Sequence, residues 1–172
     1  MATDLEALRH FLPRTPFFGG LKGEAIDRLV GMLVERVFPV GAYVFREGEQ
    51  GRSMYVVGAG ELVAMQTVGD SRPVKLLRFR PGDFFGETTL IEMQPRPFSA
   101  VVEQEARLYE LTNKDLLRLY QEDIKSYVLI LQNINRELCR RLRKAGTRIT
   151  EVVTEQAGAD EVTQIGDYLG KW

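Results

Sequence analysis

The sequence is poor in the side chains that most often carry catalysis and metal binding. Among its 172 residues there is one histidine, His10, and one cysteine, Cys139. A single cysteine excludes an internal disulfide. Neither residue lies in a nucleophile, metal-ligand or nucleotide-triphosphate motif. The sequence therefore predicts a protein that is not an enzyme and that carries no cofactor or metal.

An excess of charge of one sign and long apolar runs are lacking as well. Lys and Arg number 23 and Asp and Glu 24, which gives a formal net charge of −1. This balance argues against a general binder of nucleic acid or of membrane surfaces. No apolar run approaches the roughly 18 residues that would span a bilayer, and the N-terminus has no signal-peptide layout. We expect a cytoplasmic protein with no nucleic-acid or membrane partner.

The pattern of apolar residues predicts helices, then strands, then helices. Helical spacing is present at 4–12 and 23–34. Between residues 36 and 111 short β-branched and aromatic runs recur every 8–12 residues, with Gly, Pro or Asp in most gaps. These predicted strands are Arg36–Phe38, Tyr43–Phe45, Ser53–Val57, Glu61–Thr67, Val74–Phe79, Ser99–Glu103 and Ala106–Leu111. The central part is expected to be an all-β barrel or sandwich.

The helical period returns after Leu111. Thr112 or Asn113 can cap a short helix that has Asp115 in its first turn, and a long helix is expected over 123–153. Its apolar stripe is too long to pack on a small barrel alone, so pairing with a second copy is favoured. The stripe consists of Tyr127, Leu131, Ile134, Leu138, Leu142, Ile149 and Val152.

The most informative segment runs from residue 80 to residue 100, RPGDFFGETTLIEMQPRPFSA. Glu87 follows a glycine at the start of a predicted one-turn helix, where free backbone N–H groups favour an anion. Arg96 adds a forked, permanently charged donor. The Glu87 carboxylate can accept hydrogen bonds from hydroxyls. A ribose joined to a phosphate meets all three demands.

This segment resembles the phosphate-binding cassette of the cyclic-nucleotide-binding domain family, which includes catabolite activator proteins and protein kinase A regulatory subunits. The family pattern is F-G-E-x-x-L, a spacer, then P-R-[AST]-A-[ST]. The matching residues are Phe85, Gly86, Glu87, Leu90, Pro95, Arg96 and Ser99. Five further glycines fall where the family's barrel turns carry glycine: Gly41, Gly48, Gly51, Gly60 and Gly82. The resemblance covers about residues 14–145.

The resemblance implies a mainly β fold with flanking helices: a double-stranded β-helix (jelly-roll) barrel plus a long C-terminal helix. The expected divisions are N-terminal helices at 1–34, the barrel at 35–112 with its cassette at 82–99, C-terminal helices at 113–155 and a tail at 156–172. In relatives of the catabolite activator the long helix forms the dimer interface and covers the nucleotide.

The resemblance also implies the ligand, cAMP or cGMP, and the residues that bind it. Arg96 would hold the phosphate, Glu87 the ribose 2′-hydroxyl, and Gly86 and Thr89 would supply backbone donors, with Ser99 beside the sugar-phosphate or base. The expected ligand-binding set is Gly86, Glu87, Thr88, Thr89, Arg96, Pro97 and Ser99.

This chain departs from the family pattern in three places. Pro97 stands where the family has a backbone N–H donor, and proline has none. Phe98 replaces an alanine, and its ring either fills part of the pocket or joins the barrel core. Thr88 and Thr89 replace an aliphatic-alanine pair, so their hydroxyls either cap the short helix or supply a phosphate donor in place of the one lost.

The sequence leads to a stand-alone cyclic-nucleotide sensor that signals to an unidentified protein partner through its C-terminal helix. The alternative is a copy that no longer binds nucleotide and serves as an interaction or dimerisation module. About 20 residues follow the long helix, too few for the family's helix-turn-helix, so direct DNA reading is not expected. The basic residues 136–148 are interpreted as a solvated helix face. The tail is expected to dock on its own barrel or on a partner.

Overall fold

The computed structural model describes residues 5–69 and 72–156, which form two units, one ending at Ile134 and the other beginning at Asn135. The helices are α1 (Leu5–Phe11), α2 (Glu24–Met32), α3 (Thr88–Glu92), α4 (Asn113–Glu122) and α5 (Ile124–Gln156), with a 3-10 turn at Leu12–Arg14. The strands are β1 (Val34–Phe38), β2 (Tyr43–Phe45), β3 (Ser53–Val68), β4 (Arg72–Phe79), β5 (Phe84–Phe85) and β6 (Ser99–Thr112). The described residues follow the predicted order of helices, then strands, then helices.

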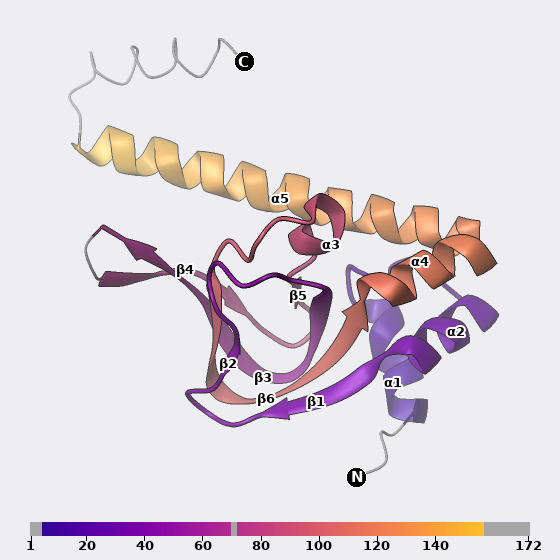
Figure 1. The fold of residues 1–172 in the computed structure, drawn as a ribbon. Coiled ribbons are helices and arrows are strands. Elements are labelled where there is room, and N and C mark those ends of the chain that lie inside the picture. Colours follow the sequence, from indigo (N-terminus) through magenta and orange to yellow (C-terminus); the bar gives the residue numbers. More distant parts are fainter. Residues whose placement is uncertain (1–4, 70–71, 157–172) are drawn as a thin grey trace. The chain divides into compact units, whose positions relative to one another are not determined.

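Two long antiparallel strands, β3 and β6, form the middle of the sheet (Figure 1). Each also pairs with two shorter antiparallel strands, β6 with β1 and β2, and β3 with β4 and β5. The pairing path runs β1-β6-β3-β4 and does not close on itself among the described strands. The fold is the antiparallel jelly-roll sheet with flanking helices that was expected, with an open sheet in place of a closed barrel.

A kink in β3 bends the two long strands. Gly60 has φ +83°, and a Cβ there would lie 2.2 Å from the carbonyl oxygen of Glu105. The register between β3 and β6 shifts on both sides of Ala59. Only glycine combines this φ with so close an approach of the neighbouring strand. The kink lets the two ends of one strand contribute to the same core.

The core is built from inward-facing side chains of several strands. Its buried members are Phe45, Tyr55, Val57, Leu62, Ala64, Phe79, Phe85, Ala100, Val102, Ala106 and Leu108. Phe85 stacks on both Phe79 and Tyr55, with ring centroids 4.7 Å and 5.5 Å apart. The aromatic packing ties β5 to the sheet, so the residue that follows Phe85 is held in a fixed place.

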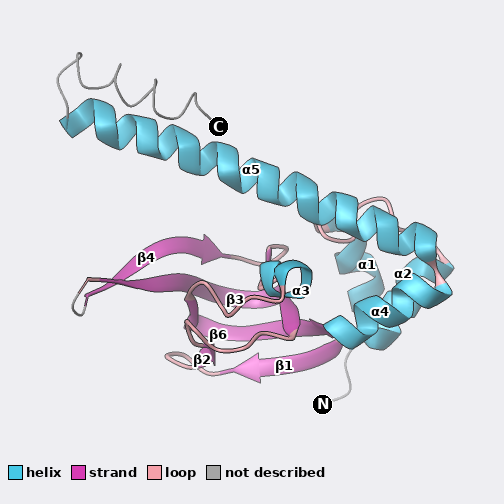
Figure 2. Cartoon of the chain, turned by 45° about the horizontal axis from the view of Figure 1, so that its top comes forward, coloured by secondary structure: helices cyan, strands magenta, loops and turns pink. Residues whose placement is uncertain are grey.

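Helices α1, α2 and α4 lie close together at one end of the sheet (Figure 2). Thr112, one of the two caps that the sequence allowed, caps α4, and together with Asp115 it forms a capping box that was not predicted. The buried Asn133 of α5 donates to the carbonyl oxygens of Phe17 at 3.0 Å and Gly19 at 2.8 Å. The Phe17 ring in turn packs edge-on against Phe84 of β5. The start of α5 is thereby fastened to the N-terminal segment and, through it, to β5.

Several predicted boundaries were wrong, each for a physical reason. The runs at 53–57 and 61–67 are one strand, because Gly60 makes a kink and not a turn. The runs at 99–103 and 106–111 are likewise one strand, β6. The two-residue strand β5 was not predicted, because its pattern is too short to show a period. Gly41, Gly48 and Gly82 do lie in turns with positive φ. The predicted tail, apart from its first residue, lies outside the described residues.

Candidate functional site

The Gly-Glu turn of the cassette follows directly from β5. Gly86 has φ +82°, and a Cβ there would lie 2.6 Å from Nη1 of Arg96. Both facts require glycine at this position. Glu87, which is buried, is the N-cap residue of α3, and the helix ends at Met93 in the left-handed conformation. The predicted one-turn helix after Gly86 is therefore confirmed as a structural element.

Arg96 lies in the interior, with 4% of its surface exposed. The connection between β2 and β3 holds its backbone. The Arg96 N–H donates to the carbonyl oxygen of Glu49 at 2.8 Å, and the Gly48 N–H donates to the carbonyl oxygen of Arg96 at 2.9 Å. A Cβ on Gly51 would lie 2.7 Å from Nε of Arg96 and 2.6 Å from Oγ1 of Thr89. Residues 48–51 therefore wrap closely around the arginine.

The guanidinium of Arg96 binds neutral oxygens. Nη2 donates to the carbonyl oxygen of Ser53 at 2.7 Å, and Nη1 donates to the carbonyl oxygen of Gly86 at 3.2 Å and to Oγ1 of Thr89 at 3.0 Å. Its carbon atom lies 4.0 Å from the ring centroid of Phe45, a cation–π contact. These groups solvate the positive charge without neutralising it, which leaves the site favourable for an anion.

Burial lowers the pKa of Arg96, which measures the cost of removing its charge from water. The carboxylates of Glu49, Glu110 and Glu87 act in the opposite direction through space. Arginine nevertheless remains charged at neutral pH, because its ordinary pKa is so high. Burial thus destabilises the charged form of Arg96, and a bound anion would stabilise it.

A chain of hydrogen bonds leads away from the arginine. Ser53 Oγ donates to the Tyr55 hydroxyl at 3.2 Å, and the Tyr55 hydroxyl donates to Oε1 of Glu110 at 3.3 Å. Glu110 is paired with Arg36 at 2.9 Å. Burial, assisted by the nearby Glu110 carboxylate, raises the pKa of Tyr55, so its hydroxyl stays protonated and keeps this order of donors. The chain connects the cassette arginine to the face of β1 and β6.

The structure brings four of the predicted site residues together and separates the others. Gly86, Glu87, Thr89 and Arg96 form the buried group. Thr88 is half-buried on α3. The Pro97 carbonyl oxygen accepts from Gln66 Nε2 at 3.3 Å, and the Ser99 hydroxyl accepts from the Glu47 N–H at 3.0 Å. Pro97 and Ser99 thus have contacts along the neighbouring loop and strand.

The orientation of Phe98, left open by the sequence, is settled by its contacts. Its ring centroid lies 5.7 Å from that of Phe45 and 6.0 Å from that of Phe79. Phe98 therefore joins the aromatic core. Phe45 lies between it and Arg96, with one contact to each.

Three contacts of the arginine were missed by sequence reasoning: Phe45, Ser53 and Gly51 in its role beside Arg96. Gly51 had been interpreted only as a turn residue. Ser53 and Phe45 belong to strands, and the sequence pattern of a strand predicts which positions are buried but not which distant residue each of them contacts. Pairing partners more than 40 residues away decide these contacts, so a linear motif contains no signal for Ser53 or Phe45.

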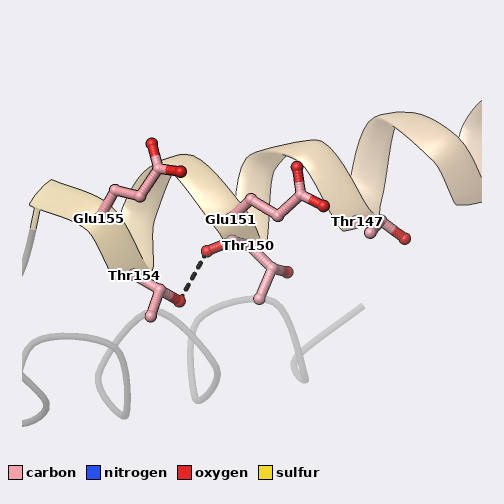
Figure 3. A pocket seen from close by; sticks show the side chains of 5 residues that line it. All are labelled: Thr147, Thr150, Glu151, Thr154 and Glu155. Carbon is pink, nitrogen blue, oxygen red and sulfur yellow. Dashed lines mark hydrogen bonds between the residues drawn. The ribbon is translucent and has the colours of Figure 1, made fainter.

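A hollow also lies along the last turns of α5, lined by Thr147, Thr150, Glu151, Thr154 and Glu155 (Figure 3). Thr154 Oγ1 donates to the carbonyl oxygen of Thr150 at 2.8 Å, a contact within the helix. The hydroxyls of Thr147 and Thr150 likewise donate to carbonyl oxygens of the same helix. All the lining side chains thus come from one helix and do not form a converging set of ligand-binding groups. Within residues 5–69 and 72–156, no cluster of His, Cys, Asp or Glu has metal-site geometry. In the same part of the chain, no helix has the length and hydropathy that spanning a membrane requires.

A jelly-roll sheet with a Gly-Glu turn and an interior arginine defines a class of small-ligand-binding domains. Comparison with protein families places the chain more narrowly: the model of the cyclic nucleotide-binding domain matches residues 35–123. The chain belongs to this family, as the cassette sequence indicated.

Individual relatives agree with that assignment. The cyclic AMP receptor protein of Thermus thermophilus is 32% identical over 145 residues, which cover 83% of this chain and 64% of the relative. A cAMP-dependent protein kinase regulatory subunit of Pyricularia oryzae is 32% identical over 110 residues, covering 64% of this chain and 27% of the relative. The crystal structure of the Thermus thermophilus catabolite activator protein matches with a TM-score of 0.71 and 29% identity, covering 80% of this chain and 63% of that one. The chain spans less than two thirds of the length of each of these relatives.

Proposed function

We propose that this chain is a cyclic-nucleotide-binding regulatory module that responds to cAMP or cGMP. The observation that carries the proposal is the buried Arg96, a positive charge surrounded by neutral oxygens beside the Gly-Glu turn. In a protein of this family, such a charge suits the cyclic phosphate. Glu87 then accepts from the ribose 2′-hydroxyl, and the backbone N–H groups of Gly86 and Thr89 donate to the phosphate. Thr88 and Ser99 flank the ligand, and Pro97 contributes no N–H.

Binding requires a local rearrangement. The N–H groups of Arg96 that would meet the phosphate are occupied by Ser53, Gly86 and Thr89. A phosphate placed at the backbone N–H groups of Gly86 and Thr89 would meet Nη1, and its oxygens would replace at least one of the two acceptors there. The exchange is favourable because the new hydrogen bond joins two opposite charges. The protein would thus have two arginine states, and the nucleotide favours one of them.

The output is proposed to pass through the C-terminal helices to a protein partner, in the cytoplasm, with two copies joined along α5. In the second unit, Leu142 and Ile149 are 74% and 55% exposed in the single chain. Apolar side chains of this size on one helix stripe are suited to packing against a second helix. The helix would then report the state of the cassette to whatever binds it.

A ligand-free interaction module is the second candidate. It is favoured by the internal satisfaction of Arg96 and by the missing donor at Pro97. One lost hydrogen bond to a charged group weakens binding by about one to two decades, which reduces but does not abolish the site. We therefore rank this candidate second.

Calorimetric titration of the ligand-stripped chain with cAMP and then cGMP tests the proposal. Three variants accompany the wild type: Arg96→Glu, Arg96→Lys, and Arg46→Glu as a control. Arg46 is an exposed arginine stacked on Tyr43, so its reversal changes net charge equally without touching the cassette. Arg96→Lys keeps the charge and loses the fork.

We expect saturable binding by the wild type and by Arg46→Glu, no binding by Arg96→Glu, and at least tenfold weaker binding by Arg96→Lys. Cooperative melting of every protein checks that the variants are folded. A folded wild type that gives no heat with either nucleotide would establish the ligand-free module.

A further inference from the structure

Thr89 is the side chain that most directly restrains the cassette arginine. It is buried, with 2% of its surface exposed. Its hydroxyl donates to the carbonyl oxygen of Gly86 at 2.9 Å and accepts from Nη1 of Arg96 at 3.0 Å. A threonine hydroxyl has one hydrogen, and here Gly86 takes it, so a lone pair must face the guanidinium. The hydroxyl is therefore an acceptor for Arg96 and offers no hydrogen to an incoming anion.

The hydroxyl and an incoming phosphate oxygen compete for the same donor. Nη1 of Arg96 has two acceptors, the Gly86 carbonyl and the Thr89 hydroxyl, while Nη2 faces the Ser53 carbonyl. Two of these three acceptors are backbone atoms that any residue would present. Among the described residues, the side-chain acceptors of the guanidinium are the Thr89 hydroxyl, at 3.0 Å from Nη1, and the more distant Ser53 hydroxyl, at 3.5 Å from Nη2. Thr89 therefore supplies the shorter of these two contacts and the one made by Nη1.

We propose that Thr89 sets the affinity of the cassette by holding Arg96 in its inward position, so that an anion must displace the hydroxyl from Nη1. The inference rests on the proposed function, because the anion in question is the nucleotide phosphate. It differs from both roles expected from the sequence: the hydroxyl neither caps α3 nor donates to phosphate. Threonine at this position weakens nucleotide binding by stabilising the ligand-free arrangement.

The test is a series at one position. Thr89→Val keeps the shape and removes the hydroxyl, and Thr89→Ser keeps the hydroxyl. Thr15→Val is the matched control, because Thr15 is also buried and its hydroxyl also donates to a carbonyl oxygen three residues earlier, that of Leu12 at 2.8 Å, but it lies outside the cassette. Each ligand-stripped full chain is titrated with cAMP by calorimetry. Loss of one hydrogen bond from the ligand-free state predicts about tenfold tighter binding by Thr89→Val. Thr89→Ser is expected to bind more weakly than Thr89→Val, and Thr15→Val is expected to bind within about threefold of the wild type.

The test is decided by whether Thr89→Val binds cAMP more tightly or more weakly than the wild type. Equal or weaker binding by Thr89→Val would overturn the proposal, and weaker binding would mean that the hydroxyl contacts the ligand. A purely structural role for Thr89 would lower the melting temperature without tightening binding. Because the valine variant destabilises only the ligand-free state, we expect a lower melting temperature without cAMP and a larger rise on adding it.

A second measurement needs no nucleotide. Nitrogen-15 NMR of the arginine side chains follows rotation of the Arg96 guanidinium, with the resonance assigned by its loss in Arg96→Lys. We expect slow rotation in the wild type and in Thr89→Ser, and faster rotation in Thr89→Val. Unchanged rotation of the Arg96 guanidinium in Thr89→Val would contradict the proposal that the Thr89 hydroxyl restrains it.

The two measurements separate the two proposals. Absence of nucleotide binding in every protein would contradict the proposed function. If the Arg96 guanidinium still rotated faster in Thr89→Val, the restraint of Arg96 by Thr89 would be supported. The proposal that this restraint sets the affinity for nucleotide would be contradicted.

Discussion

The chain holds arginines in two contrasting ways. In the cassette, Arg96 is buried against two carbonyl oxygens, a hydroxyl and an aromatic ring. In the second unit, Arg140 and Arg141 both pair with Glu137, at 2.6 Å and 2.9 Å. Neutral dipoles stabilise the charge of Arg96, whereas the negative charge of Glu137 offsets part of the positive charge of Arg140 and Arg141. In the first arrangement the charge is buried without a paired carboxylate among the described residues, whereas in the second a carboxylate lies directly against both arginines.

The pKa directions express the same difference. Burial lowers the pKa of Arg96, and the surrounding carboxylates do not reverse the change. Burial would raise the pKa of Glu137, but the hydrogen bonds from Arg140 and Arg141 outweigh it, and the pKa is lowered. Glu137 is thus paired with groups of opposite charge, whereas Arg96 is hydrogen-bonded to neutral groups. The presence of arginine in a sequence says little about function until its acceptors are known.

The largest effect is expected from filling the space that the cassette arginine needs. Gly86→Ala forces a side chain into a positive φ and places a Cβ 2.6 Å from Nη1 of Arg96. We expect it to destabilise the fold by about 2–4 kcal/mol, combining backbone strain with overpacking, and to abolish nucleotide binding. Chemical denaturation and cAMP titration measure the two effects.

Gly82→Ala is the matched control for this substitution. Gly82 has a similar φ of +94°, but an added Cβ would have no atom within 4 Å. Only the strain should remain, about 1 kcal/mol, with binding preserved. Equal losses in the two variants would show that contact with Arg96 contributes nothing.

A smaller loss of stability is expected when the carboxylate that pairs with Arg140 and Arg141 on α5 is removed. Glu137→Gln removes the partner of both arginines and should destabilise the protein by about 0.5–1 kcal/mol at neutral pH. Because the folded-state pKa of Glu137 is lowered, its contribution is fully present above the ordinary value of 4.5 and is lost as the pH falls through the lower folded value. The gap between the melting temperatures of wild type and variant should therefore be constant at neutral pH and close in acid.

A gap that widened on acidification would contradict the assigned direction of the Glu137 pKa. Glu151→Gln serves as a comparison, since the exposed Glu151 pairs with a single arginine, Arg148, at 2.9 Å. Its substitution should change stability less than Glu137→Gln does.

The sequence predicted those parts of the molecule that local patterns encode. Helices at both ends, most strand runs and a helix cap at Thr112 or Asn113 follow from short-range periodicity and chemistry. The Gly86-Glu87 turn followed by Arg96 was found because a linear motif preserves its spacing. By contrast, Ser53 and Phe45 reach Arg96 through strand pairing and core packing, which depend on distant residues. The contact between the Thr89 hydroxyl and Arg96 was not predicted for the same reason, because it joins two side chains that lie seven residues apart in the sequence.

The smallest effect is expected from breaking the hydrogen-bond chain behind the arginine. Tyr55→Phe removes the hydroxyl that links Ser53 to Glu110 and keeps the ring that stacks on Phe85. Glu110 retains Arg36, so no charge is left alone. The loss should be about 0.5–1.5 kcal/mol in chemical denaturation. Tyr43→Phe, at an exposed ring, should change stability by less than about 0.5 kcal/mol. If Tyr55→Phe also alters Arg96 rotation by NMR, the chain orients the guanidinium as well as stabilising the sheet. If rotation is unchanged, the three oxygens that contact Arg96 directly are sufficient to fix it.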